Sequence, residues 1–266
     1  MSQYALRVFL YVCVVSGLFS HACAAAQLQL NIKINLDGRN FLIANQQKIT
    51  IALASPASAD DAAVVAAMTL QPIADTTQIV FDPAVALYLT YWPVTAFDIL
   101  GMALQSPVVY GQAYSFNGVQ INGNGNGLRG YVSIYYDAPL NSQPVVTGLA
   151  WFIYDITMGK PSTPSPVNYY TLNRFETRVI TQSAPIVWVF VASGINTGSV
   201  LPLSILKPVT PPSSNSNSEA AVSGSNSVVP QIGRYLSVNV DPSTQATIHF
   251  DLASNAFADG PYPTEK

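Results

Sequence analysis

Few residues of this 266-residue chain have the chemistry to catalyse a reaction. The sequence contains two histidines, His21 and His249, and the second lies two residues before Asp251. In an extended segment these two side chains share one face, with Ile248 and Phe250 on the other. Such a pair could orient a general base, but no Gly-x-Ser-x-Gly motif supplies a nucleophile for it. The pattern therefore favours the exposed polar face of a terminal strand.

Three carboxylates are candidates for a glycosidase, which needs two acidic side chains about 5 to 10 Å apart. Asp137, Asp155 and Glu176 each end or flank an aromatic-rich segment. Their sequence spacing does not show that any two face each other, and Arg174 and Arg178 share a predicted strand face with Glu176. We therefore expect a surface ion pair at Glu176, and no catalytic residue, metal or cofactor. A hydrolase with a carboxylate pair is the alternative.

A metal site would require a particular N-terminus. If cleavage followed Ser20, the chain would begin at His21, whose amine and ring nitrogens could bind Cu(II) together with His249. That arrangement resembles the histidine brace of lytic polysaccharide monooxygenases. The three alanines at 24–26 fit a signal peptidase better, because they place small residues at the −3 and −1 positions.

The segment 122–127 repeats Asn-Gly three times. A phosphate-binding loop would need a helix after it, whereas the strand-like segment Tyr131 to Tyr136 follows. Calcium favours carboxylates over the asparagine oxygens on offer. Because Asn and Gly tolerate positive φ, the repeat predicts a flexible turn between two strands.

Aromatic side chains are the best candidates for binding. Exposed rings can stack on sugars while neighbouring amides bond the hydroxyls, although ordinary sheet packing also favours tyrosine. The candidate residues are Tyr131, Tyr135, Tyr136, Tyr169, Tyr170, Asn122 and Asn124. They predict a lectin-like site for carbohydrate.

The N-terminal segment predicts export. Arg7 precedes the apolar run Val8 to Phe19, which covers roughly 18 Å as a helix and is too short for a bilayer core of about 30 Å. Cleavage after Ala26 would leave residues 27–266 as a secreted chain. Cys13 and Cys23 lie in the removed segment, so we expect no disulfide.

The charge content narrows the range of partners. Charged residues make up 9% of the chain, against about 25% in an average protein. There is no cluster of Lys and Arg, so we expect no nucleic acid partner. No later apolar run reaches 18 residues, so we expect no membrane span.

The elements that must position these residues are mostly short strands. Alternating or β-branched runs bounded by Gly, Pro or Asn predict an all-β fold, an antiparallel β-sandwich of the jelly-roll or immunoglobulin-like kind. Asp37 and Gly38 predict a turn. The alanine-rich segment Ala62 to Met68 is the one candidate helix, but it is so short that a strand is the alternative. The predicted strands are 28–34, 48–53, 78–81, 85–91, 114–121, 131–136, 145–156, 175–180, 186–191, 235–240 and 247–252.

The segment Lys207 to Pro230 is dominated by Pro, Ser, Asn and Gly and predicts a low-complexity loop. The alternating segments 235–240 and 247–252 predict a final hairpin that returns to the main sheet. Residues 27–266 would then form a single domain. A similarity between residues 79–89 and 179–189, at a constant offset of 100, raises the alternative of two related half-domains.

The resulting hypothesis is a secreted or wall-associated, non-enzymatic binding protein whose ligand is a glycan or a cell-wall surface. The alternative from another class is an extracellular structural protein that self-associates through uncharged β edges. The carboxylate-pair hydrolase is the third hypothesis.

Overall fold

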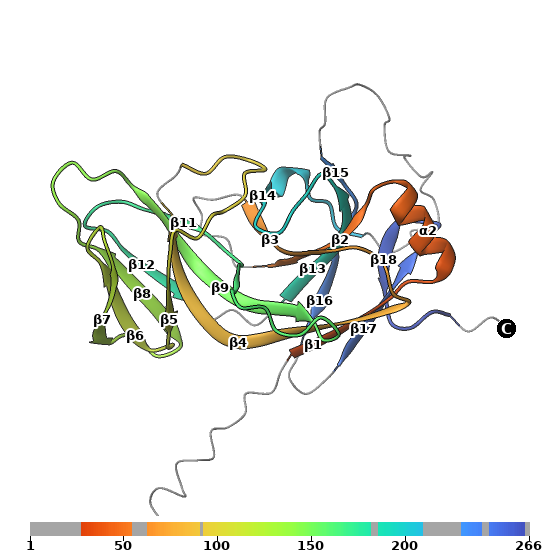
Figure 1. The fold of residues 1–266 in the computed structure, drawn as a ribbon, viewed down its shortest axis with the longest axis horizontal. Helices are drawn as coiled ribbons and strands as arrows, with labels where there is room; N and C mark the ends of the chain where they lie inside the picture. Colours follow the sequence, from red (N-terminus) through yellow and green to blue (C-terminus); the bar gives the residue numbers. More distant parts are fainter. Residues whose placement is uncertain are drawn as a thin grey trace, which may run out of the picture.

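A computed structural model describes residues 28–54, 63–90, 93–181, 186–209, 230–240 and 245–263. The predicted signal peptide, both cysteines, His21 and most of the predicted low-complexity loop lie outside the described residues. The described chain is nearly all β, as predicted, and its strands form three sheets of eight, four and six strands in a sandwich-like arrangement (Figure 1).

The eight-stranded sheet has the order β10-β9-β4-β1-β17-β18, with β11 also paired to β9 and β5 to β4. Its two longest strands, β4 and β9, have 15 and 11 residues. Most pairs are antiparallel, as predicted, but β1 and β17 run parallel. The strands are β1 (Leu28–Lys33), β4 (Thr76–Thr90), β5 (Leu104–Val108), β9 (Val145–Asp155), β10 (Ser165–Pro166), β11 (Tyr170–Leu172), β17 (Ala246–Asp251) and β18 (Ala256–Asp259).

The six-stranded sheet has the order β14-β3-β2-β13-β15, and β16 also pairs with β13. A 3-10 turn, η1 (Leu203–Ile205), follows β14. The strands are β2 (Lys48–Leu53), β3 (Ala63–Leu70), β13 (Ile186–Ser193), β14 (Val200–Pro202), β15 (Gln231–Ile232) and β16 (Leu236–Asn239).

The four-stranded sheet lies at one end of the body, on the left in Figure 1. Its order is β12-β8-β6-β7, and β6 and β8 are parallel. The strands are β6 (Gln112–Phe116), β7 (Ile121–Asn126), β8 (Tyr131–Tyr136) and β12 (Thr177–Thr181).

One large apolar cluster contains residues from all three sheets, among them Leu30, Ile51 and Ile134, each fully buried. Two smaller clusters, around Phe190 and around Tyr88, lie outside it. Burial of this much apolar surface is the main stabilising contribution to a fold with no cysteine among its described residues. That residues 27–266 form one domain stays a prediction.

The turn predicted at Asp37 and Gly38 is wrong, because these residues begin helix α2 (Leu36–Ala44). The Asn35 side chain caps the helix by accepting a hydrogen bond of 2.8 Å from the Gly38 N–H. Gly38 is needed for close packing, since a Cβ there would lie 2.9 Å from the Phe250 ring. Glycine therefore marks a contact here and not a turn.

Of the two alternatives at 62–68, the helix does not form and the strand does, since residues 63–70 form strand β3. This strand lies between β2 and β14. Val64, Val65, Ala66 and Ala67 are all buried, so neighbours cover both of its faces. Tertiary packing overrides the helical propensity of alanine.

Residues 79–89 and 179–189, which resemble each other in sequence at an offset of 100, differ in structure. Residues 79–89 belong to β4, one strand with a bulge between Asp82 and Val85. Residues 179–181 belong to β12 in the four-stranded sheet, and 186–189 belong to β13 in the six-stranded sheet. The resemblance therefore does not reflect a shared hairpin.

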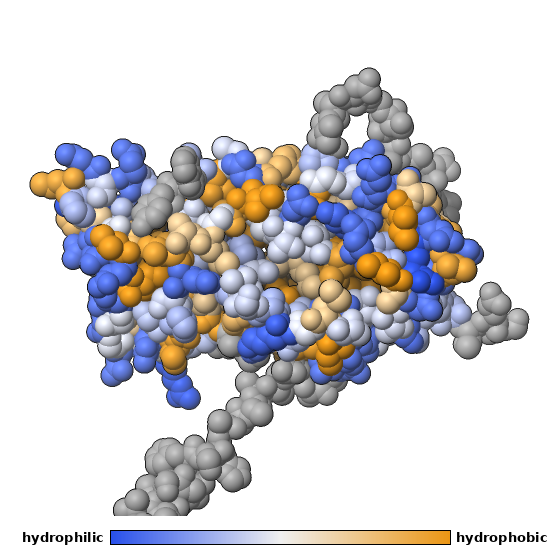
Figure 2. All heavy atoms as spheres, in the orientation of Figure 1, coloured by the Kyte–Doolittle hydropathy of each residue, from blue (hydrophilic) through white to orange (hydrophobic). Residues whose placement is uncertain are grey.

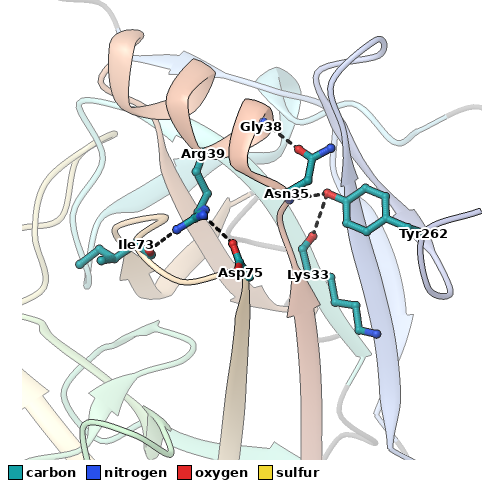
Figure 3. A network of polar contacts seen from close by, with 7 residues as sticks. All are labelled: Lys33, Asn35, Gly38, Arg39, Ile73, Asp75 and Tyr262. Atoms are coloured by element: carbon teal, nitrogen blue, oxygen red, sulfur yellow. Dashed lines mark hydrogen bonds and ion pairs between the residues drawn. The ribbon is translucent and has the colours of Figure 1, made fainter.

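The predicted final hairpin is wrong as well. Strand β16 pairs with β13, whereas β17 pairs with β1 and β18, so the two segments join different sheets. Both still dock on the core, as the alternation indicated. Figure 3 shows one tie of the C-terminal segment, in which the Tyr262 hydroxyl accepts from the Asn35 N–H at 2.8 Å. The same hydroxyl donates to the Phe250 carbonyl at 3.0 Å.

Candidate functional site

Strand β8 separates its side chains cleanly between two faces. Val132, Ile134 and Tyr136 are buried and belong to the large apolar cluster. Tyr131 is 38% exposed, and Tyr135 is half-buried. Because side chains alternate along a strand, Tyr131, Ser133 and Tyr135 form the other face of β8, which points away from the core.

The strand register assembles a surface from this face, here called the outer face. Residues directly opposite one another in neighbouring strands share a face. One row across the sheet is therefore Thr177, Tyr135, Ser115 and Asn122. The outer face consists of Tyr131, Ser133 and Tyr135 on β8, Thr177, Val179 and Thr181 on β12, Ala113 and Ser115 on β6, and Asn122 and Asn124 on β7.

Phe175 enlarges the aromatic part of the outer face. Its ring stacks on Tyr135, with centroids 6.5 Å apart and planes inclined by 15°. The Arg174 guanidinium lies 3.7 Å from the Phe175 ring centroid, and Arg174 Nε donates to the Ala138 carbonyl at 2.7 Å. Phe175 nevertheless remains 55% exposed. A large exposed ring held in place by its neighbours can bind a ligand with little loss of conformational entropy.

The amides of β7 present donors beside these rings. The Ser115 hydroxyl donates to Asn124 Oδ1 at 3.1 Å, and Gln120 Nε2 donates to Asn122 Oδ1 at 2.9 Å. Both asparagine oxygens are thus engaged, and both NH2 groups can still donate. The outer face therefore combines aromatic rings with hydrogen-bond donors.

The outer face is also uncharged. None of the residues that form it carries a charge at neutral pH. Strand β12 does contain Arg178, but alternation places this residue on the opposite face from Thr177 and Val179. There Arg178 Nε pairs with Glu176 Oε1 at 2.9 Å, the surface ion pair that the sequence predicted. The four strands therefore contribute no charged side chain to the outer face, and the Arg174 guanidinium lies against it only at the Phe175 ring.

Tyr136 does not belong to this surface. It is 3% exposed, stacks on Phe116 at a centroid distance of 5.3 Å, and donates its hydroxyl to the Gln143 carbonyl at 3.1 Å. An edge of Tyr136 lines an open hollow of about 480 Å³ between the turn at 117–119 and the segment 139–144. Its role in the described structure is core packing.

Tyr169 and Tyr170 lie on the eight-stranded sheet and not with the other candidates. Tyr170 is 8% exposed and pairs with Thr147 of β9. Tyr169 packs against the cluster around Tyr88. Of the seven predicted residues, Tyr131, Tyr135, Asn122 and Asn124 therefore come together, and Tyr136, Tyr169 and Tyr170 do not join them.

The expectation that His249 lies on an exposed polar face is wrong. The histidine is 8% exposed, its ring lies 4.8 Å from the Tyr262 ring, and its Nδ1 is 2.9 Å from the Gly260 carbonyl. A carbonyl only accepts, so Nδ1 carries the proton. Asp251 accepts instead from Ser254 and the Ala253 N–H. Strand β18 and the segment after it cover a face that the sequence alone left open.

Neither Asp137 nor Glu176 lies close enough to Asp155 to form a glycosidase pair with it. Tyr136 at the end of β8 contacts Gln143 just before β9 begins, and Asp155 ends β9, about 30 Å further along this strand. Asp137 and Glu176 lie near the same end of the four-stranded sheet. The Glu176 oxygens, however, are engaged by Arg178 and by the Asn173 N–H at 2.9 Å.

The Asn-Gly repeat is not the flexible turn that was predicted. Residues 121–126 form strand β7, which pairs with β6 and has a bulge opposite Ala113 and Tyr114. Pairing with a neighbour satisfies the backbone, so these low-propensity residues become a strand. The asparagines thereby gain fixed positions on the outer face.

Phe175 and Val179 were missed by the sequence-based prediction of the site. Phe175 lies in a turn, with φ of 62°, and not in the strand predicted at 175–180, which begins at Thr177. Alternation in that segment was used only to place Arg174, Glu176 and Arg178. Val179 is 45% exposed although valine is usually buried. An exposed valine between two threonines is the one local signal that could have marked this edge.

No protein-family model, curated protein or solved structure matches the chain. Among the described residues, no helix is long and apolar enough to cross a membrane, and no group of three or more His, Cys, Asp or Glu side chains could hold a metal ion.

Proposed function

We propose that the protein is an exported, non-enzymatic binding protein that attaches to a neutral polysaccharide through the outer face. The observation that carries the proposal is the gathering of Tyr131, Tyr135 and Phe175 with Asn122 and Asn124 on one uncharged surface. Rings that stack on the apolar faces of sugars, beside amides that bond hydroxyls, are the ordinary means of binding a neutral sugar.

Hydropathy on the face drawn in Figure 2 indicates no stronger surface. On the face drawn in Figure 2, apolar and polar residues are intermixed, and the apolar ones do not gather into one extended patch. Scattered apolar residues of this kind are normal on a protein surface. The outer face differs because its aromatic residues are ordered by strand register.

The test is retention on insoluble polysaccharides. We expect the full chain to bind at least one of cellulose, chitin and xylan, and Tyr135→Ala to weaken that binding about tenfold, a loss of ~1.4 kcal/mol. Tyr154→Ala is the matched control, because Tyr154 is a half-buried tyrosine of β9 away from the outer face. Since the surface is uncharged, 1 M salt should not elute the protein.

Two outcomes would contradict this proposal. The first is an absence of binding to every neutral polysaccharide. The second is binding to heparin–agarose that salt abolishes, because this would indicate that charged groups outside the outer face bind the ligand.

Export is supported by the sequence of residues 1–26, with Arg7 before an apolar run and alanines at 24–26. The mature chain should begin at Gln27, and mass spectrometry of the secreted protein would determine this. A secreted chain that begins at His21 would instead favour the copper site.

Self-association is the second candidate function. Charged residues and prolines keep the exposed edges of sheets from pairing with other chains. Edge strand β7 contains neither. Sedimentation velocity would then detect oligomers of the unchanged protein, and Asn126→Lys should dissociate them into monomers. A monomer at all concentrations would reject this alternative.

A further inference from the structure

We infer that the outer face binds several consecutive sugars of an extended chain that lies along β6 and β8, and does not bind a single sugar or a chain end. This inference rests on the proposed function and specifies its ligand. It follows from the spacing of the tyrosines, the size of the residues between them and the positions of the asparagines.

The two tyrosines are too far apart to serve one sugar ring. Tyr131 and Tyr135 lie four residues apart on the same face of β8, which places their Cα atoms about 13 Å from each other. Stacked rings have centroids only about 4.5 to 7 Å apart. One sugar can therefore stack on one tyrosine at a time, and simultaneous use of both rings requires a chain.

The residues beside the tyrosines leave room for such a chain. Strand β6 runs parallel to β8, with Ala113 opposite Ser133 and Ser115 opposite Tyr135. Gly111 continues the same column beside Tyr131, to which it is bonded through its N–H. Neither Ala113 nor Ser115 has a side chain larger than serine, so a ligand can approach the backbone beside Ser133 and Tyr135. At the Gly111 end the Arg129 backbone lies closer, 3.9 Å from the position of a Cβ on Gly111.

The far side of this column carries the donors. Asn122 lies opposite Ser115, and Asn124 is bonded to the same serine. Their amide NH2 groups have no acceptor among the described residues, and sugar hydroxyl oxygens would supply one. A chain over β6 would thus have tyrosine rings on one side and amide donors on the other.

The strands under the inferred chain argue for a neutral ligand, because β6, β7 and β8 contain no charged residue. A uronic acid or sulfated sugar would lose hydration over these strands without gaining a cationic partner from them, which is unfavourable. A neutral sugar has no such desolvation cost. The inferred ligand is therefore a neutral polysaccharide.

The test is the dependence of affinity on chain length, measured by calorimetry with the full chain. The probes are cello-oligosaccharides, chito-oligosaccharides and xylo-oligosaccharides of one to six sugars, in the series whose polymer retains the protein. We expect affinity to rise at least tenfold between the disaccharide and the hexasaccharide. Equal affinity for the disaccharide and the hexasaccharide would overturn the inference while leaving the proposed function intact.

Variants test the placement of the chain. Tyr131→Ala should remove most of the gain with length, so that the hexasaccharide binds within about threefold of the disaccharide. Ala113→Leu, which fills the column of small residues and keeps both tyrosines in the sequence, should do the same. Tyr154→Ala should keep the full gain, and circular dichroism should show every variant folded.

The outcomes separate the two proposals. A gain with length that survives both Tyr131→Ala and Ala113→Leu would place the chain elsewhere and overturn the inference. If no oligosaccharide or polymer of any kind binds, the proposed function fails, and the inference fails with it. Capture of a protein ligand by the outer face in place of a glycan would have the same result.

Discussion

At the scale of single residues, a close approach between two segments of the chain requires glycine at position 148. Gly148 of β9 lies opposite Tyr88, and a Cβ on Gly148 would be 2.2 Å from the Asn168 carbonyl oxygen and 2.8 Å from the Tyr88 ring. The Tyr88 hydroxyl donates to that same carbonyl at 2.7 Å. Glycine is required here because the backbone of another segment occupies the space of a side chain.

Tyr110 makes the stability of the fold sensitive to alkaline pH. Burial raises the pKa of its hydroxyl to about 12, and the Trp151 indole N–H, which lies near it without the geometry of a full hydrogen bond, lowers the pKa slightly. In the unfolded chain a tyrosine loses its proton near pH 10. The contribution of Tyr110 to stability is therefore intact below pH 10 and is lost as the pH rises toward 12.

We expect Tyr110→Phe to lessen this loss by about 1 kcal/mol at pH 11. Urea unfolding of the two proteins at pH 8 and pH 11 measures it, and the pH 8 pair controls for any change in packing. An identical drop in both proteins would show that the Tyr110 hydroxyl titrates normally.

At the scale of elements, the described structure depends on strands and segments that meet from distant parts of the sequence. Strand β1 lies between β4 and β17, which is more than 200 residues away in sequence. The N-terminus of α2 is tied to the same region, because Tyr262 reaches back to Asn35 (Figure 3). A second tie links α2 to the segment before β4, where Arg39 pairs with Asp75.

Tyr262→Phe should weaken this junction. The change removes the acceptor of the Asn35 N–H and the donor to the Phe250 carbonyl while it keeps the ring on His249. Since one hydrogen bond contributes about 0.5–1.5 kcal/mol, we expect a loss of ~1 kcal/mol in the free energy of unfolding. Urea denaturation measures this loss as a lower midpoint, with an unchanged dependence of the unfolding free energy on urea concentration.

Tyr154→Phe serves as the control, because the Tyr154 hydroxyl has no hydrogen-bond partner within the described residues. Equal urea midpoints for Tyr262→Phe and Tyr154→Phe would mean that the C-terminal tie is not stabilising.

At the scale of the whole molecule, the segment after residue 230 supplies strands to two sheets. Strands β15 and β16 pair with β13, and β17 lies between β1 and β18. Five large side chains of this segment are at most 6% exposed, namely Val238, Val240, Ile248, Phe250 and Phe257. Burial of each contributes about 1.5–3 kcal/mol, so the segment should be held by the core and not only by its peptide link.

We therefore expect a chain cut at a protease site inserted after Ser218 to stay assembled. The two fragments should elute together on gel filtration under native conditions and separate in 6 M guanidinium. If the C-terminal fragment leaves while the remainder stays folded, the segment is an appendage, and the single-domain prediction fails.

The sequence by itself determined several of the strands and, within them, which side chains face inward. Alternation in 131–136 and β-branched runs such as 186–191 are local properties, and the packing of apolar side chains acts on them directly. Tyr131 and Tyr135 share a face because of alternation along β8. Asn122 and Asn124 join them on the outer face through the pairing of β7 with β6 and of β6 with β8.

Only the tertiary structure decided which strands are neighbours and which faces are covered. The parallel pairing of β1 with β17, the strand at 63–70 and the burial of His249 all depend on segments far away in the sequence. Phe175 likewise reaches Tyr135 only through the register of β12 on β8. Local propensities differ by about 1 kcal/mol or less per residue, whereas burial of one large side chain contributes more, so packing across the whole chain selects the partners.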